Sequence, residues 1–366
     1  TFLPFITSTG ELKTKPTQHS VRELRGIGIQ PDAIICRSDH AVPADLRRKI
    51  MIHCDVPIEG VLMLPTVSTI YEVPLILEKQ GMGNLIRDTL SLETQNDEST
   101  PSDDWKKLVS MIKAEKECLK ISVVGKYVDL HDAYISVKEA LIHAGIEYSR
   151  NIEIKWVDSE DIEENGPEKY LHDSAGVVVP GGFGYRGVEG MISAVEFCRV
   201  NDIPYLGLCL GMQVMVIEAA RSLLDKKSAN STEFVKDTPD PVIHIMEDQK
   251  GIKDKGGTMR LGGYPCDLIA GTIASKAYGN IKDTIMERHR HRFEFNNLYR
   301  EDLISVGLKP SGMSPDGNLV EIVEYSGNEF MLGTQFHPEF LSRPTIPHPI
   351  FSEFVSASVN KVNKNR

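Results

Sequence analysis

The amino-acid sequence predicts an α/β protein made of two units that a polar segment connects. Short apolar runs of strand length alternate with longer segments that carry helical periodicity, which is the pattern of sheets covered by helices. One stretch, Ser91 to Asp104, is polar and acidic and offers almost no apolar side chain to a core. A length of 366 residues also favours two domains over one.

The first predicted unit covers residues 1–90 and has the α/β pattern of part of a domain. Its expected elements are strands at Asp32–Cys36 and Val61–Leu64 and helices at Val21–Gly26 and Pro43–Cys54. Residues 91–117 are predicted to be a linker followed by a connecting helix. That helix is capped near Ser102 and runs from Trp105 to about Lys116.

The second predicted unit covers residues 118–366. Unbroken apolar runs that begin at Ile121, Gly176 and Ile203 predict strands buried on both faces. Helices are expected at Ala133–Ala144 and Val188–Asn201, and another follows Cys209. This alternation predicts a parallel sheet with helices on both sides.

Charge and cysteine content restrict the partners and the compartment. A net charge of -11 argues against a nucleic-acid or anionic-membrane surface, and no apolar run approaches the roughly 20 residues of a membrane helix. The six cysteines show no CxxC pairing, so we expect a reducing, cytoplasmic environment. The chain starts at Thr1 without an initiator methionine, in what reads as the approach to a loop, and we therefore expect a fragment of a longer protein.

The segment G-L-C-L-G at 207–211 joins a buried strand to an apolar helix. Such a turn raises a nucleophile above the carboxyl edge of a sheet, with glycines relieving the crowding, and the helix amino terminus favours a thiolate. Cys209 is thus a candidate nucleophile. A core cysteine is the alternative, because free cysteines are among the most buried residues.

A second glycine-rich turn, P-G-G-F-G-Y-R-G at 180–187, follows the strand that begins at Gly176. It should lie at the same sheet edge, where its backbone amides can point at an oxyanion. We expect one oxyanion donor near Gly182 and a second at the amide of Leu210. The alternative is an ordinary turn between a strand and a helix.

The segment M-L-G-T-Q-F-H-P-E-F at 331–340 supplies a candidate base. His337 and Glu339 are two residues apart, so in extended backbone they project from one side and the carboxylate can orient the imidazole. A surface ion pair is the alternative for this pair alone.

Together, and in this order, the three segments resemble the class I glutamine amidotransferases over roughly residues 118–360. The resemblance implies a doubly wound, flavodoxin-like α/β domain and a triad of Cys209, His337 and Glu339 that releases ammonia through a glutamyl thioester. It further implies a set of residues that hold L-glutamine, with Glu233 on its α-ammonium and Arg292 on its α-carboxylate. That set is Gly182, Leu210, Gly211, Met212, Gln213, Glu233 and Arg292.

Other stretches resemble the members of this family that aminate UTP to CTP. They are K-T-K-P-T-Q-H-S-V at 13, I-Q-P-D-A-I-I-C-R-S-D at 29, A-N-S-T-E-F at 229, G-G-T-M-R-L-G at 256 and E-R-H-R-H-R-F-E-F-N at 287. The front of the chain then corresponds to the carboxyl-terminal part of a Rossmann-like, P-loop synthetase domain.

This resemblance implies nucleotide sites in the front unit and a regulatory site in the second. UTP, and CTP as feedback inhibitor, would bind Lys13, Thr14, Lys15, Pro16, Thr17, Gln18 and Lys49, and ATP would bind Pro65, Thr66 and Val67. The loop at 256–262 resembles a lid linked to activation by GTP, and Phe183 offers that purine a stacking face.

The sequence departs from the resemblance in one respect, since it contains no G-x-x-x-x-G-K-[ST] loop. We expect glutamine hydrolysis from this chain and no complete synthesis. No metal ligand or resident cofactor is predicted, Mg-ATP being expected for the full-length enzyme, along with a homotetramer that forms filaments. Other amidotransferases, γ-glutamyl hydrolases and a non-enzymatic assembly module are the alternatives.

Overall fold

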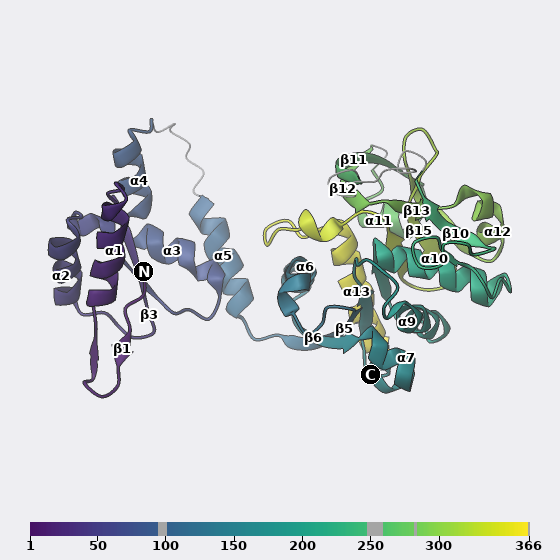
Figure 1. Ribbon diagram of the computed structural model, residues 1–366, viewed down its shortest axis with the longest axis horizontal. Coiled ribbons are helices and arrows are strands. Elements are labelled where there is room, and N and C mark those ends of the chain that lie inside the picture. Colours follow the sequence, from purple (N-terminus) through teal and green to yellow (C-terminus); the bar gives the residue numbers. More distant parts are fainter. Residues whose placement is uncertain (94–100, 247–258, 282–283, 365–366) are drawn as a thin grey trace. The chain divides into compact units, whose positions relative to one another are not determined.

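The structure is a computed structural model that describes residues 1–93, 101–246, 259–281 and 284–364 (Figure 1). The chain divides into two compact units, residues 1–114 and 115–366. The helix predicted as part of the connection, α5 (Pro101–Lys113), groups with the first unit, because the Trp105 indole donates to the Tyr71 carbonyl at 2.7 Å. Residues 94–100 of the predicted linker lie outside the described residues.

The first unit is a small α/β arrangement. In chain order its main elements are β1 (Phe5–Ile6), β2 (Glu11–Leu12), α1 (Lys15–Gly26), β3 (Ile34–Ser38), α2 (Ala44–Cys54), β4 (Val61–Pro65), α3 (Val73–Lys79), α4 (Met82–Leu90) and α5. Strands β3 and β4 pair in parallel, with α2 between them in the chain, as in a βαβ unit. The strands and α2 lie within two residues of their predicted positions, whereas α1 begins six residues earlier than predicted. Pro16 permits this start, because proline needs no hydrogen-bond acceptor in a first helical turn.

The second unit is built on one large sheet. Its strands in chain order are β5 (Glu117–Gly125), β6 (Arg150–Asp158), β7 (Gly176–Val179), β8 (Tyr205–Leu208), β11 (Arg260–Leu268), β12 (Ile285–His291), β14 (Leu308–Met313), β15 (Val320–Tyr325) and β16 (Met331–Thr334). Within the described residues they form a nine-stranded sheet of order β12-β11-β14-β15-β16-β8-β7-β5-β6. Strands β9 (Asn230–Ser231), β10 (Pro241–Ile245) and β13 (Phe293–Phe295) form a separate small sheet.

About half of the large sheet is parallel, as the sequence predicts. Strands β6, β5, β7, β8 and β16 are parallel neighbours, and the doubly wound fold is confirmed there. The prediction of a parallel sheet does not extend to β15, β14, β11 and β12, which pair antiparallel. Antiparallel neighbours need no crossover helix, so this half carries little of the strand-and-helix alternation on which the prediction relied.

Helices cover both faces of the parallel half. They are α6 (Ile135–Glu147), α7 (Ser159–Asn165), α9 (Val188–Val200), α10 (Leu210–Leu223) and α13 (Pro349–Lys364) (Figure 1). Two shorter helices, α11 (Ile273–Ala277) and α12 (Arg300–Ser305), pack against β14 in the antiparallel half. Along β7, Val177 and Val179 pack in the core with α9 and α10, whereas Val178 packs in the core with α6 and α13. Successive side chains of a strand point to opposite faces, so a strand buried on both faces must be apolar throughout.

Among the described residues, no helix has the length and apolar character needed to cross a membrane.

Candidate active site

Cys209 lies in a sharp turn between β8 and α10. Its backbone has φ 51° and ψ -96°, a left-handed conformation that a residue with a side chain rarely adopts, and its N–H donates to the Thr334 carbonyl at 2.7 Å. A Cβ on Gly207 would lie 2.5 Å from the backbone of Gly211, and one on Gly211 would lie 2.1 Å from the Val179 carbonyl oxygen. Close backbone approach therefore requires both glycines, and the structure has the elbow that the sequence predicts.

The base follows the strand beside the nucleophile. β16 pairs in parallel with β8, so the chain that leaves β16 arrives next to Cys209. His337 Nδ1 lies 2.7 Å from Glu339 Oε1, and the His337 N–H donates to the Arg288 carbonyl of β12 at 2.8 Å. A Cβ built on Gly181 would lie 2.8 Å from His337 Cε1 and 3.6 Å from Cys209 Cβ, which places the three residues together.

The electrostatics of His337 favour the imidazolium. Burial alone would lower the pKa of this histidine, but the Glu339 carboxylate and the hydrogen-bonded Cys209 sulfur raise it to about 10. A protonated imidazole beside a thiol stabilises the thiolate, which is the nucleophilic form of cysteine. The three side chains thus have the contacts of a cysteine–histidine–carboxylate triad.

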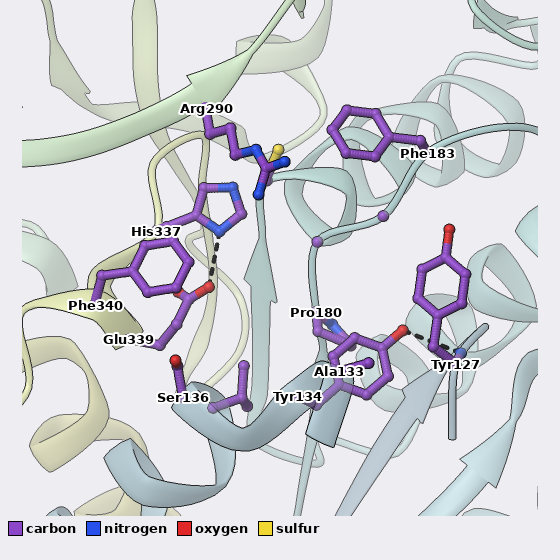
Figure 2. Close-up of a pocket in the computed structure, with 14 residues that line it drawn as sticks. Tyr127, Ala133, Tyr134, Ser136, Pro180, Phe183, Arg290, His337, Glu339 and Phe340 are labelled. Carbon is purple, nitrogen blue, oxygen red and sulfur yellow. Dashed lines mark hydrogen bonds and ion pairs between the residues drawn. The ribbon is translucent and has the colours of Figure 1, made fainter. Parts of the chain in front are cut away.

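The triad opens onto a cavity of about 260 Å³. Figure 2 shows Arg290, His337 and Phe340 on one side of it and Phe183 and Tyr127 on the other. Phe340 stacks on the His337 ring with centroids 5.4 Å apart. The site is small and has the charged Arg290 and the His337 imidazole on one side, which suits a single small polar substrate.

The predicted oxyanion loop lines this cavity through Pro180, Gly181, Gly182 and Phe183. The Lys126 ammonium donates to the carbonyl oxygens of Phe183, at 3.3 Å, and of Gly184, and the Gly184 N–H donates to Glu233 Oε1 at 2.8 Å. Lys126 is 3% exposed, and burial lowers its pKa to about 8 although Glu233 opposes the shift. These contacts hold the backbone of the loop in place.

Leu210, the second predicted oxyanion donor, is the first residue of α10. Amides of a first helical turn have no acceptor within their helix and point beyond its end, where an anion can accept from them. The elbow therefore aims this amide at the space around Cys209.

The residues predicted to hold glutamine are only partly gathered at the cavity. Gly182 lines it, and Leu210–Gln213 form the buried first turn of α10. Glu233 holds the oxyanion loop instead of lining the cavity. Arg292 is not among the lining residues either, whereas Arg290, two positions earlier on β12, is one of them. Side chains of β12 alternate between buried and exposed, and Arg290 lies on the exposed face of the strand.

The predicted UTP residues lie at the start of α1. Lys13 Nζ lies 2.5 Å from Glu11, and Gln18 Nε2 donates to the Thr14 hydroxyl at 3.0 Å. Thr17 is fully buried with its hydroxyl directed at Thr1, so its side chain does not face solvent.

A cavity of about 410 Å³ adjoins this start of α1. Its lining residues are Lys15, Gln18, His19, Val21, Arg22, Arg25 and His53. Lys49, also predicted for UTP, lies on α2, and Pro16 lies in the first turn of α1.

The predicted ATP residues follow β4. Pro65 ends this strand, and the Thr66 N–H donates to the Ser38 carbonyl at 3.0 Å while its hydroxyl donates to Asp39. Val67 comes next. The three residues thus lie at the carboxyl edge of the parallel pair β3 and β4, where open α/β sheets bind ligands.

One buried cluster near His337 has the residue types of a metal site. His289, His291 and Glu321 bring one potential ligand atom each to within 4.8 Å of one another. The Arg260 guanidinium lies among them, 2.7 Å from Glu321 and 3.3 Å from His289 Nδ1. Burial raises the pKa of Glu321 to about 7 against the opposing charge of Arg260. A cation is already part of this cluster.

The loop predicted as a lid is only partly described. Residues 256–258 lie outside the described residues, and Arg260 to Gly262 form the start of β11. Lys126, Arg290 and Gln335 were not predicted from the sequence, because their contacts come from segments far apart in the chain. Gln335 stands two residues before His337, but its position there does not indicate a contact with Cys209.

Two family models match the chain. The model of the class-I glutamine amidotransferases matches residues 129–357, and the model of the CTP synthase N-terminus matches residues 1–92. The chain is 58% identical over 360 residues to the CTP synthase of Dehalococcoides mccartyi and 57% identical over 359 residues to that of a Roseiflexus species. These matches cover 98% of the chain but 65% and 64% of the relatives, so the chain spans less than two thirds of their length.

A third relative, the CTP synthase of Herpetosiphon aurantiacus, is 53% identical over 362 residues, and the match covers 67% of it. Among solved structures, the glutaminase domain of the Trypanosoma brucei CTPS with bound acivicin matches with a TM-score of 0.62 and 38% identity. That match covers 66% of this chain and 94% of the trypanosomal domain, which agrees with the fold of the second unit.

Proposed function

Because this chain belongs to the CTP synthase family and carries a class-I glutamine amidotransferase domain, we propose that its second unit hydrolyses L-glutamine to glutamate and ammonia. The observation that carries the proposal is the contact of Cys209, His337 and Glu339 at one cavity. The alternative, a cysteine that only packs in the core, does not account for the hydrogen-bonded imidazole and the cavity beside Cys209.

The first half of the reaction forms a thioester. The Cys209 thiolate attacks the side-chain carboxamide carbon of glutamine, and the carbonyl oxygen becomes an oxyanion that the Leu210 amide and the Gly182 region can bind. His337, held by Glu339, donates a proton to the amide nitrogen. The C–N bond breaks, ammonia leaves, and a glutamyl thioester of Cys209 remains.

The second half restores the enzyme. Neutral His337 now takes a proton from water, whose oxygen attacks the thioester carbon in the same oxyanion site. The C–S bond breaks, glutamate leaves, and the thiolate faces the imidazolium again. Arg290, the cation on the cavity wall, is suited to oppose the α-carboxylate of the substrate.

Glutamate release tests this proposal. The chain is compared with Cys209→Ser and with Cys118→Ser, the matched control, because Cys118 is an exposed cysteine outside the cavity. We expect glutamate from the wild type and from Cys118→Ser and none from Cys209→Ser. Equal activity in Cys209→Ser would refute the triad.

Covalent labelling gives a second measurement that does not require turnover. Acivicin is the compound bound in the trypanosomal glutaminase domain, and we propose that it alkylates Cys209 here. Peptide mass spectrometry should find the adduct on Cys209 and not on Cys118. A folded protein that shows neither labelling nor glutamate release would contradict the proposed activity.

We also propose that the full-length protein uses the ammonia to aminate UTP to CTP, with Mg-ATP as co-substrate and CTP as feedback inhibitor. Membership of the family supports this, and so does the position of Lys15 and Gln18 on a cavity that four further basic or imidazole side chains line. Calorimetric titration with UTP should show weaker binding to Lys15→Ala than to Lys79→Ala, an exposed lysine on α3. Equal binding by the two variants would contradict this site.

Activation by GTP is proposed to involve Phe183. Phe183 lines the cavity and is 50% exposed, so a purine can stack on its ring. GTP should stimulate glutamate release by Tyr185→Ala, the matched exposed aromatic in the same loop, and should stimulate Phe183→Ala much less. Unchanged activation of Phe183→Ala would contradict this role.

A cytoplasmic homotetramer that forms filaments completes the proposal for the full-length protein, and light scattering tests the oligomeric state.

A further inference from the structure

A buried glutamine side chain contacts the proposed nucleophile. Gln335 Nε2 lies 3.6 Å from Cys209 Sγ, and Gln335 is 1% exposed. A buried side-chain amide at this distance donates a hydrogen bond to sulfur. The proposed roles of His337 and Glu339 leave this contact without a function.

The hydrogen bonds around Gln335 determine which end of its amide faces the sulfur. Gln213 Nε2 donates to the Phe293 carbonyl oxygen at 3.1 Å, so the Gln213 atom at this position must be the nitrogen. The same nitrogen donates to Gln335 Oε1 at 3.2 Å. The oxygen of Gln335 therefore faces Gln213, and its NH₂ group is left to face Cys209.

The backbone of Gln335 is held as firmly as its side chain. Its N–H donates to the Glu321 carbonyl of β15 at 2.8 Å, one residue after the end of β16. With both ends fixed, the amide cannot turn away from the sulfur without losing bonds in a buried environment, where unpaired polar groups are costly.

We propose that Gln335 is a further catalytic residue, whose side-chain amide donates a hydrogen bond to the Cys209 sulfur and stabilises the thiolate. This inference rests on the proposed glutamine hydrolysis. The sulfur carries negative charge twice in that reaction, before it attacks the carboxamide and when it leaves the second tetrahedral intermediate. A donor fixed beside it favours both states, as an oxyanion donor does on the other side of the reacting carbon.

Other groups also act on this sulfur, and the test must separate them from Gln335. The titratable or charged side chains that line the cavity with Cys209 are Tyr127, Tyr134, Arg290, His337 and Glu339. The buried cluster of Arg260, His289, His291 and Glu321 interacts electrostatically with His337 through its two histidines. The variants below leave all of these residues in place.

The test measures the alkylation of Cys209 by iodoacetamide as a function of pH. Peptide mass spectrometry resolves the adduct of Cys209 from that of Cys118, which is exposed and serves as an internal control in the same sample. Gln335→Met keeps the length of the side chain and removes the donor. We expect the midpoint of the Cys209 profile to rise by about one to two pH units, as the loss of a hydrogen bond to a charged group implies.

Turnover should be slower as well. The kcat/KM for glutamine should fall on the order of 10- to 100-fold in Gln335→Met. Gln335→Glu keeps the shape but places a carboxylate beside the sulfur, and it should raise the midpoint further than Gln335→Met does. A midpoint in either variant equal to that of the wild type, with or without lost activity, would show a merely structural role and overturn the proposal.

A second position protects the test against misfolding of the Gln335 variants. Gln213→Met removes the orienting partner and leaves the donor, so it should raise the midpoint by less than Gln335→Met. An unshifted profile in a folded Gln213→Met protein would also overturn the proposal. Because alkylation needs no glutamine, a wild type that releases no glutamate would refute the hydrolysis while the midpoint still decides the role of Gln335.

Discussion

A methyl group on Gly181 would collide with the proposed base. The Cβ of Gly181→Ala would lie 2.8 Å from His337 Cε1. Carbon atoms in favourable contact are about 3.5 to 4.0 Å apart, so the imidazole or the oxyanion loop must retreat by roughly 0.7 to 1.2 Å.

The imidazole has little freedom to retreat. Its Nδ1 is bonded to Glu339 at 2.7 Å, the His337 N–H is bonded to Arg288, and the ring stacks on Phe340. A displacement of this size separates the base from the sulfur or moves the oxyanion donors. Misplacing reacting groups by about 1 Å costs on the order of 100-fold in rate, and overpacking costs about 1–3 kcal/mol of stability.

The assay compares kcat/KM for glutamate release and the free energy of unfolding in Gly181→Ala and Gly327→Ala. Gly327 is the matched control, because a Cβ at that position would meet nothing within 4 Å. We expect a loss of roughly 100-fold in Gly181→Ala and little change in Gly327→Ala. Activity of Gly181→Ala within threefold of the wild type would refute the position assigned to the base.

Three further predictions concern the base, the oxyanion loop and the elbow. Burial disfavours the His337 imidazolium, and the Glu339 carboxylate is foremost among the interactions that outweigh it and raise the pKa to about 10. In the wild type the imidazolium is lost only as pH rises through that value. Glu339→Gln should therefore move the alkaline limb of the kcat/KM profile to lower pH. An alkaline limb at the wild-type pH would contradict the pairing of His337 with Glu339. Lys126→Met removes the donor to the carbonyl oxygens of the oxyanion loop and should lower kcat for glutamine about tenfold. Lys126→Arg should recover part of this activity, and steady-state kinetics measures both variants. Gly211→Ala would place a Cβ 2.1 Å from the Val179 carbonyl oxygen. It should lower the free energy of unfolding of the second unit by more than about 3 kcal/mol in urea unfolding. A variant as stable as the wild type would contradict the close approach of Gly211 to Val179.

The elbow could be predicted from the sequence because its determinants are local. Gly207, Cys209 and Gly211 stand within five residues, and the close contacts of the two glycines explain their places. His337 and Glu339 could be paired for the same reason, since two residues in extended backbone share a face. The start of α1 at Lys15 also had a local signal in Pro16, which the apolar periodicity alone did not use.

The contacts between distant segments could not be predicted. Gln335 touches a sulfur that is 126 positions away in the sequence, and no pattern in either segment indicates that contact. Arg290 was missed because the alternation in R-H-R-H-R does not reveal which residues face the cavity, and only the pairing of β12 with β11 decides it.

The order of the strands assembles the site from these segments. β7, β8 and β16 are successive parallel neighbours, so the chain segments that leave their carboxyl ends carry the oxyanion loop, the nucleophile and the base side by side. The antiparallel half completes the assembly, because β12 accepts the His337 N–H through Arg288 and brings Arg290 to the cavity. The half of the sheet that the sequence predicts thus supplies the reacting groups. The half that it does not predict fixes the base and supplies the cation for the substrate, so substitutions there should alter both the recognition of glutamine and the reactivity of Cys209.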